Sequence, residues 1–372
     1  MAENKTVYSN FNFCGEIVIP KKNGPWVKRD TYNGTDKITL NFGIKVDTNI
    51  GYVTATDWKH DEIKTKNTDG DDMTVRWADR FDEDIIKEVA SSKKYVVHIG
   101  ERKEFITIWD MVEYLETVLD GYDKPITATG RFVLRPGTGK SSDKVFREFQ
   151  LQNVYAVGEN YEPRLNMNME LYYDRDSMDK STLEENGKIV MKCYTPQWVT
   201  SEGVTKMFAI PVVFNTAVFD LTKEKHKKFY DYKMRYLTTK SRNPVHMNWA
   251  IGVVNGAEEI PFSIDTLTDA QREQVELGLT KLEDYRQRGT IYGQRVNELR
   301  LIKPILKGEF ADSATAEPSI YTASEFEDEI YTPKSDETVD DMVNGGKSKS
   351  KPKQEPVANA TNDDDDTLEN MF

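Results

Sequence analysis

Cysteine, histidine and long apolar runs are scarce in this 372-residue sequence, and each absence excludes a class of protein. The two cysteines, Cys14 and Cys193, lie too far apart in the sequence to suggest a disulfide framework or a cysteine metal site. No run approaches the roughly 18 apolar residues of a membrane span, and the first residues lack a signal-peptide pattern. We therefore expect a reduced, cytoplasmic protein without a membrane partner.

Patterns typical of catalysis are equally sparse. The four histidines, His60, His98, His226 and His246, have no metal-ligand spacing. The acidic run Asp69-Gly-Asp-Asp72 overlaps the end of Lys59 to Gly70, a charged segment that is predicted to be a loop, so a loop explains the run better than a metal site. Gly137-Thr-Gly-Lys-Ser-Ser lacks the spacing and the following helix of a phosphate-binding loop. We predict no enzymatic activity, no cofactor and no metal, and keep a metal-dependent nuclease as a minor alternative.

Negative charge is abundant, and most of it lies at one end of the chain. The net charge is −13, and residues 311–372 hold sixteen acidic and five basic residues, a net of −11. The preceding residues are therefore nearly neutral at −2, so they can carry a basic groove although the protein is acidic. A detached acidic tail is a flexible polyanion and could compete with a nucleic acid for that groove.

The sequence ends with a run of four aspartates followed by apolar residues. Asp363 to Asp366 repel one another and should stay solvated, whereas Leu368, Met371 and Phe372 are apolar. An acidic run with a terminal aromatic anchor suits a docking peptide, whose ring fills a pocket and whose charges steer the encounter. The alternative is a solvated acidic terminus that happens to end in phenylalanine.

This tail resembles the C-terminal tip of single-stranded DNA-binding (SSB) proteins of bacteria and of the bacteriophage T7 type. The matching residues are Asp363, Asp364, Asp365, Asp366 and Phe372, and Met371 stands where the bacterial pattern has proline. In those families the tip recruits replication and repair proteins, so the resemblance implies that these six residues dock a partner. The departure at Met371 leaves the identity of that partner open.

The first part of the chain has the pattern of a small β-barrel. Ile38 to Val46 alternates apolar and polar residues with the period of a half-buried strand, and Asn33-Gly34 is a tight-turn signal before it. Gly51 to Trp58 continues the meander. An apolar stripe predicts a helix over Ile108 to Leu119. Two further strands, Ile126 to Leu134 and Phe146 to Tyr155, complete the strand order of the oligonucleotide/oligosaccharide-binding (OB) fold.

The second part repeats this plan with insertions. Strands are predicted at Leu165 to Tyr173 and Val245 to Val254, a basic helix at Lys223 to Tyr236, and a capped helix at Thr268 to Arg288. We match the helix and strands of Ile108 to Tyr155 with Thr268 to Leu306. The predicted fold class is mainly β with inserted helices: tandem OB-like β-barrels at 1–160 and 161–308, then a disordered acidic tail at 309–372.

Two short pieces interrupt the polar composition of this predicted tail. They are Ser319 to Thr322 and Glu329 to Pro333, which flank Phe326 among acidic residues. They suit a second docking motif or a segment that folds back on the body, and scattered residues in a linker are an equal alternative.

Single-strand binding requires aromatic faces for bases and cations for phosphates. Aromatic and basic residues that are interleaved in the predicted strands and loops are the candidate DNA-binding residues: Trp26, Lys28, Arg29, Tyr32, Trp58, Arg76, Trp77, Arg131, Arg135, Lys140, Arg147, Trp198, Lys206 and Arg242. We expect Trp26 and Tyr32 to be exposed, and Trp109 and Trp249 to lie in the core.

The leading hypothesis is a non-catalytic SSB protein, similar to those of bacteriophages. It would coat single-stranded DNA during replication, recombination and repair in the cytoplasm of its host, and recruit partner proteins through its tail. The alternative from another class is a structural or assembly β protein of a virus, whose acidic tail is a solubility device. The sequence leaves the oligomeric state open.

Overall fold

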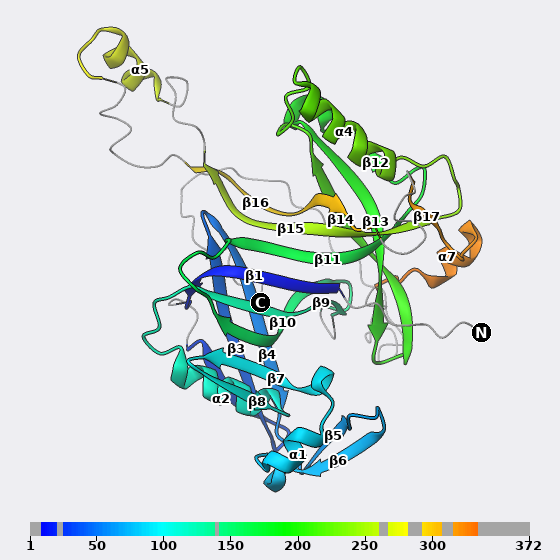
Figure 1. Cartoon of the computed structure of the whole chain (residues 1–372). Coiled ribbons are helices and arrows are strands. Elements are labelled where there is room, and N and C mark those ends of the chain that lie inside the picture. Colours follow the sequence, from blue (N-terminus) through cyan, green and yellow to red (C-terminus); the bar gives the residue numbers. More distant parts are fainter. Residues whose placement is uncertain are drawn as a thin grey trace, which may run out of the picture. The chain divides into compact units, whose positions relative to one another are not determined.

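The computed structural model describes residues 9–20, 25–137, 141–259, 267–281, 292–306 and 315–333. Strands dominate these residues and helices are few and short (Figure 1). The predicted class, mainly β with inserted helices, is confirmed. Residues 334–372, which include the acidic run and Phe372, lie outside the described part of the chain.

Five strands near the N-terminus close into a barrel. They are β1 (Ser9–Val18), β3 (Thr35–Val46), β4 (Asn49–Trp58), β9 (Ile126–Pro136) and β10 (Val145–Ala156). The ring runs β1–β3–β4–β10–β9 and returns to β1, with a parallel contact only between β4 and β10. Helix α2 (Ile108–Val118) lies between β4 and β9 in the chain. This is the OB topology that the sequence predicts.

A second ring follows the same plan. Its strands are β11 (Arg164–Tyr173), β13 (Lys188–Val199), β14 (Val204–Asn215), β15 (Val245–Glu259) and β16 (Tyr292–Pro304). The ring runs β11–β13–β14–β16–β15 and returns to β11, again with one parallel contact, between β14 and β16. Helix α4 (Glu224–Leu237) occupies the place of α2. The chain therefore contains tandem OB-like barrels.

The two barrels also share their register. The corresponding pairs are Gln150 with Thr54 and Arg131 in the first barrel, and Arg300 with Val213 and Gly252 in the second. Even the β-bulge of β10 beyond Leu151 recurs in β16 beyond Leu301. Our match of Thr268 to Leu306 with Ile108 to Tyr155 is therefore wrong in its helix: α4 is the counterpart of α2.

Direct strand pairing joins the two barrels. β1 pairs antiparallel with β11, and β4 pairs with β15 through Asn49 and Gly256. A Cβ atom on Gly256 would lie 2.2 Å from the carbonyl oxygen of Thr48, so glycine permits this close approach. Strands β16, β15, β11, β1, β9 and β10 consequently lie side by side in one continuous sheet (Figure 1). The predicted boundary at residues 160 and 161 falls between β10 and β11, and the division into two domains at this boundary stays a prediction.

An insertion in the first barrel follows β4. It contains a hairpin of β5 (Glu62–Lys66) and β6 (Asp72–Arg76), followed by helix α1 (Glu83–Glu88). The insertion has a small core of its own, formed by Val75, Val89 and Ile106. The hairpin β7 (Tyr95–Ile99) and β8 (Glu101–Phe105) extends the main sheet beside β10. The expectation of a loop from Lys59 to Gly70 is therefore wrong, because charged residues alternate along the exposed side of this hairpin.

Three short elements occur in the second barrel's connections. β12 (Met178–Asp179) pairs with β13, and α3 (Leu183–Asn186) precedes β13. Helix α5 (Asp269–Glu276) begins with the predicted capping box of Thr268 and Gln271. It ends well before the predicted Arg288, and residues 282–291 lie outside the described ranges.

Part of the predicted tail is folded onto the second barrel. Residues 317–331, which we call the strap, contain β17 (Glu317–Pro318) and α7 (Ala323–Glu329). β17 pairs with the start of β15, and Phe326 of α7 is only 7% exposed. The expectation that 309–372 is disordered throughout is therefore wrong for the strap, and a segment that folds back on the body is confirmed.

Candidate nucleic-acid interface

The outer surface of β3 and β4 is the part of the first barrel that OB folds use for oligonucleotides. Side chains alternate along both strands, so Ile38, Leu40 and Phe42 are buried while the residues between them face outward. The outward-facing residues, which together with Tyr32 form what we call the β3–β4 face, are Lys37, Thr39, Asn41, Gly43 and Lys45 on β3 and Ile50, Tyr52, Thr54, Thr56 and Trp58 on β4.

Two aromatic rings and a cation meet at one end of the β3–β4 face. The Tyr32 ring lies 6.3 Å from the Trp58 ring at 67°, and the Tyr32 side chain is 65% exposed. The Nζ atom of Lys37 lies 5.3 Å from the centre of the Trp58 ring. Asn33 and Gly34, both at positive φ, form the tight turn that leads from Tyr32 into β3.

Asp57 fixes the end of β4 that carries Trp58. Its carboxylate accepts hydrogen bonds from the backbone N–H of Trp58 at 2.9 Å and of Trp109, in the first turn of α2, at 3.0 Å. Burial raises the pKa of Asp57, partly offset by these backbone hydrogen bonds. The Trp58 ring is thus carried by a strand end that is tied to a helix.

At the other end of this face an aromatic ring covers a glycine. Gly43 pairs directly with Tyr52, and a Cβ atom on Gly43 would lie 2.6 Å from Ile50 and 3.4 Å from the Tyr52 ring. Lys45, two residue pairs further along and on the same face, is exposed. The face therefore carries aromatic rings and cations at both ends, with small polar residues between them.

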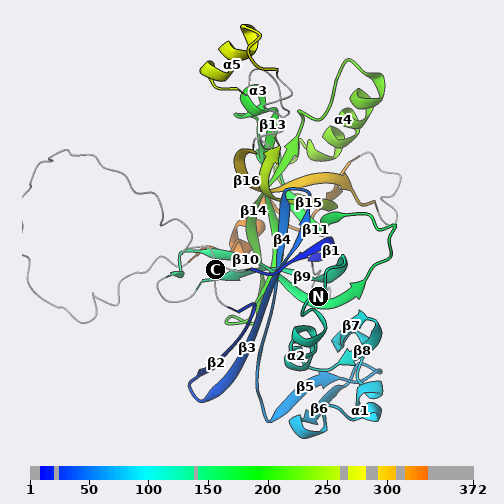
Figure 2. The same cartoon turned by 90° about the vertical axis from the view of Figure 1, so that its left-hand side faces the viewer.

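The β2 (Val27–Tyr32) hairpin holds the other candidates of this region (Figure 2). Lys28 is exposed and lies 3.2 Å from Asp30. Arg29 donates two hydrogen bonds to the carboxylate of Glu116 on α2, at 2.7 and 3.2 Å, and this contact raises its pKa. Trp26 is half-buried and packs against the core, contrary to the expectation of exposure. Lys28 and Arg29 are therefore both exposed cations, and each has an acidic partner.

The remaining candidates of the first barrel are dispersed. Arg131 and Arg135 lie on β9 and the exposed Arg147 on β10, and Arg135 is paired with Glu148 at 2.6 Å. In the insertion, Arg76 is paired with Asp79 at 2.6 Å, and the Trp77 ring lies 6.2 Å from that of Trp109. Trp109 is half-buried against the core, and Trp249 is fully buried, as expected. Lys140 lies outside the described residues.

The strap occupies the second barrel beside Lys206. The Tyr331 ring stacks on the Phe208 ring at 4.3 Å and 7°, and its N–H donates to the carbonyl of Met207 at 2.9 Å. Lys206 donates to the carbonyl oxygen of Asp328 at 3.1 Å and lies 3.6 Å from the Glu329 carboxylate. This candidate cation is therefore engaged within the protein.

The helix of the strap crosses the outer sides of β11 and β13. Phe326 lies 5.9 Å from the Tyr172 ring and 5.3 Å from the Tyr194 ring. His246 bridges the carboxylates of Glu170, at 2.8 Å, and Glu317 of the strap, at 3.7 Å. Trp198, 50% exposed, and Arg242, also exposed, are the other candidates on this barrel. The structure does not bring them to the β3–β4 face.

Sequence analysis missed Lys37, Lys45 and Tyr52. The signal for them was the period of two in Ile38 to Val46 and Gly51 to Trp58, which places these residues opposite the apolar ones. The same period that predicts these strands also places the three side chains together on the outer face.

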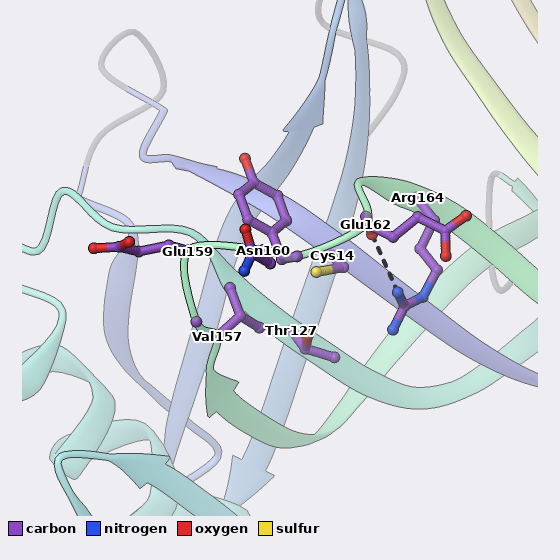
Figure 3. A pocket seen from close by; sticks show the side chains of 9 residues that line it. Cys14, Thr127, Val157, Glu159, Asn160, Glu162 and Arg164 are labelled. Carbon is purple, nitrogen blue, oxygen red and sulfur yellow. Dashed lines mark hydrogen bonds between the residues drawn. The ribbon is translucent and has the colours of Figure 1, made fainter.

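A depression of about 430 Å³ opens beside the linker between the barrels (Figure 3). Figure 3 shows Glu159 and Glu162 at its edge, and the Arg164 guanidinium donates to the Glu162 carbonyl at 3.1 Å. The depression is therefore lined by charged side chains of both signs. Within the described ranges, no cluster of three or more His, Cys, Asp or Glu side chains is placed to hold a metal, and no helix has the length and apolarity of a membrane span.

Comparisons with known proteins give only a weak likeness. No protein-family model and no curated protein matches the sequence. The fold is similar to the wild-type single-stranded DNA binding protein of Thermus aquaticus, with 10% identity, 67% of this chain and 85% of that chain covered, and a TM-score of 0.29. A deletion mutant of the same protein gives 11% identity, coverage of 67% and 87%, and a TM-score of 0.30. Such scores add nothing on function, which rests on the residues of this chain.

Proposed function

We propose that the protein binds single-stranded DNA through the β3–β4 face of the first barrel, and that this binding depends little on the base sequence of the DNA. The observation that carries this proposal is the group of Tyr32, Trp58 and Lys37, where exposed aromatic surface and a cation meet on the strands that OB folds use for oligonucleotides. Binding of this kind serves replication and recombination, where single strands are exposed.

The chemistry of this face suits a single strand and not a duplex. Base stacking on an aromatic ring is worth about 1 to 3 kcal/mol per base and tolerates any sequence. In a duplex the base faces are already stacked on one another, so Tyr32 and Trp58 have nothing to stack against. Lys37 and Lys45, on the same strand, are suited to hold the phosphates that follow the bases.

The first barrel is the principal site because the strap covers part of the second barrel, around Tyr172, Tyr194 and Phe208. The strap carries five acidic and no basic residues, and its rings already stack on Phe208 and Tyr172. A polyanionic strand would have to displace it. Single-strand binding at this part of the second barrel is therefore disfavoured while the strap is in place.

The acidic C-terminus has a second role in this proposal. Asp363 to Asp366, Met371 and Phe372 recruit replication and recombination proteins, as the resemblance of this tip implies. The docking chemistry is an aromatic ring with a carboxylate, preceded by charges that steer the encounter.

Fluorescence polarisation tests the proposal with the full-length protein. A labelled oligo-dT and a duplex of equal length are titrated across a salt series, with wild type and Trp58→Ala. We expect tight, salt-sensitive preference for the single strand, and a loss of about fivefold or more in Trp58→Ala. Phe229→Ala is the matched control, because Phe229 is 51% exposed on α4 of the second barrel. Equal binding to duplex, or no binding, would remove the proposal.

A further inference from the structure

A groove of about 530 Å³ crosses the outer side of β1, β9, β10 and β11, where the two barrels join. It adjoins the depression of Figure 3, with which it shares Arg164. Its lining is almost uncharged: Asn10, Phe11, Asn12, Thr129, Gly130, Gln152, Asn153, Arg164, Asn166, Met167 and Asn168. We call it the amide groove, because asparagine and glutamine dominate its polar lining.

Four of these asparagines form a nearly symmetric set. Asn10 pairs with Asn168 and Asn12 pairs with Asn166 across the β1–β11 contact. Side chains of directly paired residues point to the same face of a sheet, so all four share the outer side. A local two-fold axis through the pair of Phe11 and Met167 relates the two Asn-x-Asn segments.

The register of the barrels shows that these asparagines are true counterparts. Asn10 pairs with Arg131, and Asn166 with Gly252, the counterpart of Arg131. Asn12 and Asn168 correspond in the same way through Thr129 and Ala250. The two barrels thus carry asparagine at the same two positions of their first strands.

Outward positions near the groove have otherwise diverged. Four pairs of counterparts, each given with the residue of the first barrel before that of the second, differ in charge or polarity: Arg131/Gly252, Gln150/Arg300, Glu16/Tyr172 and Lys45/Tyr194. Asparagine is also disfavoured in strands, and any polar residue would serve a merely solvated surface. Asparagine nevertheless occupies both positions in both barrels, Asn10 with its counterpart Asn166 and Asn12 with its counterpart Asn168. Strand formation alone does not explain this.

The amides of this set are available to a ligand. Asn10, Asn12 and Asn168 are exposed, and Asn12 accepts a hydrogen bond from Arg164 Nε at 3.2 Å. Asn153 is different: it is bound to Thr129 and to the N–H of Val96, so it supports the wall. An asparagine amide offers one acceptor and two donor hydrogens, the combination that pairs with the hydrogen-bonding edges of nucleobases.

Two cations border the amides on opposite sides. Arg131 on β9 is in register with Asn10, and Arg164 on β11 contacts Asn12. Among the residues that the structure describes, no acidic side chain lines the groove. Uncharged amides between two guanidinium groups suit a chain that alternates hydrogen-bonding bases with phosphates.

We propose that the amide groove is a second site for single-stranded DNA, at which Asn10, Asn12, Asn166 and Asn168 bind the edges of unpaired bases. This inference rests on the proposed function. It adds a different kind of contact, because the β3–β4 face stacks on the faces of bases whereas the amide groove contacts their edges. Removing the bases from a strand should therefore abolish the contribution of the asparagines.

The test combines a protein change with a change of ligand. The double variant Asn12→Ala/Asn168→Ala removes one amide from each barrel, and Asn160→Ala, an exposed asparagine of the linker, is the matched control. Polarisation titrations use a long mixed-sequence single strand and an abasic strand of equal length. Thermal unfolding and sedimentation velocity of each variant show that fold and oligomeric state are kept.

We expect the double variant to bind the base-containing strand about tenfold more weakly than wild type, and to bind the abasic strand equally. Unchanged binding of the base-containing strand would overturn the inference, and so would an equal loss on the abasic strand. A wild-type dimer that the double variant dissociates, with unchanged affinity per protomer, would make the groove an interface between copies and also overturn it. The variant Trp58→Ala separates the two proposals. If Trp58→Ala weakens binding and the double asparagine variant does not, only the proposal of the amide groove fails. If the wild-type protein binds neither strand, both proposals are contradicted.

Discussion

Arg29 and Lys37 lie in the same hairpin but have different electrostatic partners. Arg29 is held by the carboxylate of Glu116, with Glu113 3.9 Å away, whereas Lys37 lies over the Trp58 ring. A cation that contacts a ring keeps its charge uncompensated, and one that is paired with a carboxylate does not. Lys37 is therefore better suited than Arg29 to meet a phosphate.

Alanine substitutions should separate these two roles. Lys37→Ala should weaken single-strand binding and reduce the slope of log affinity against log salt by about one, because one phosphate contact is lost. Arg29→Ala should leave affinity within about twofold and lower the free energy of unfolding by less than about 1 kcal/mol, because its ion pair is half exposed. Salt-dependent polarisation and urea unfolding measure both. A loss of single-strand affinity in Arg29→Ala greater than this twofold limit would show that Arg29 contributes to DNA binding.

At this scale the sequence predicted residue types better than their partners. Tyr32 and Trp58 were predicted and lie together, because a tight turn and strand alternation are local signals. Arg29, Arg135 and Lys206 were predicted as DNA contacts, yet each has an acidic partner on another element. Those pairings depend on tertiary packing, which local patterns do not contain.

Among the elements, the strap is held by rings more than by charges. Phe326 is buried against Tyr172 and Tyr194, and Tyr331 stacks on Phe208. The capping box of Thr322 and Glu325 begins α7 and orients Phe326 toward the barrel. The strap therefore behaves as part of the second barrel's outer layer.

Phe326→Ala should release this element. We expect a loss of about 2 to 4 kcal/mol in the free energy of unfolding, with faster hydrogen exchange in the strap and in β11 and β13 beneath it. Ile320→Ala, at an 81% exposed position of the same strap, is the control and should change little. Unaltered exchange in the strap of Phe326→Ala would contradict this packing role.

High pH should loosen the same element. Burial raises the pKa of Tyr172, Tyr321 and Tyr331. A raised pKa means that the folded state holds the phenol proton more tightly, so this stabilisation is complete below the unfolded value of about 10 and is lost as pH rises through the folded values. Phenolate absorbance and near-UV circular dichroism should change together above pH of about 10. Titration of all tyrosines as free phenols without any change in dichroism would contradict the expectation.

The sequence predicted strands and helices well but not the fate of the strap. Its residues Ser319 to Thr322, Phe326 and Glu329 to Pro333 were recognised as aromatic pieces, but the acidic composition around them favoured disorder. The surface that receives them, Tyr172, Tyr194 and Phe208, lies more than a hundred residues away in the sequence. Similarly, the capping box of α5 led us to match this helix with α2. Capping is a local signal, whereas the correspondence of α2 and α4 follows from the register of the two barrels.

In the whole molecule, two barrels of equal register are joined through their first strands. Pairing of β1 with β11 leaves neither strand as an exposed edge along their paired residues. The tandem OB-like order was predictable from the helix and strand pattern of each unit. The pairing between barrels was not, because the outward asparagines of β1 and β11 gave no apolar signal.

Charge is distributed unevenly over the same whole molecule, since residues 311–372 carry a net of −11. Deleting Asp363 to Phe372 should leave thermal unfolding unchanged and should keep or raise affinity for single strands, because a polyanion that competes for the groove is removed. Polarisation and differential scanning fluorimetry of the truncated protein measure this. A large loss of affinity would show that the tail itself contributes to DNA binding.

The central claim is that a single strand lies on the β3–β4 face of the first barrel, and crosslink mapping tests it most directly. Oligo-dT with photoreactive bases is irradiated with the full-length protein, and the crosslinked residues are identified by mass spectrometry. We predict crosslinks to Tyr32, Tyr52 and Trp58, which disappear when unlabelled oligo-dT is in excess. Crosslinks confined to the second barrel, with none on β2, β3 or β4, would contradict the assignment.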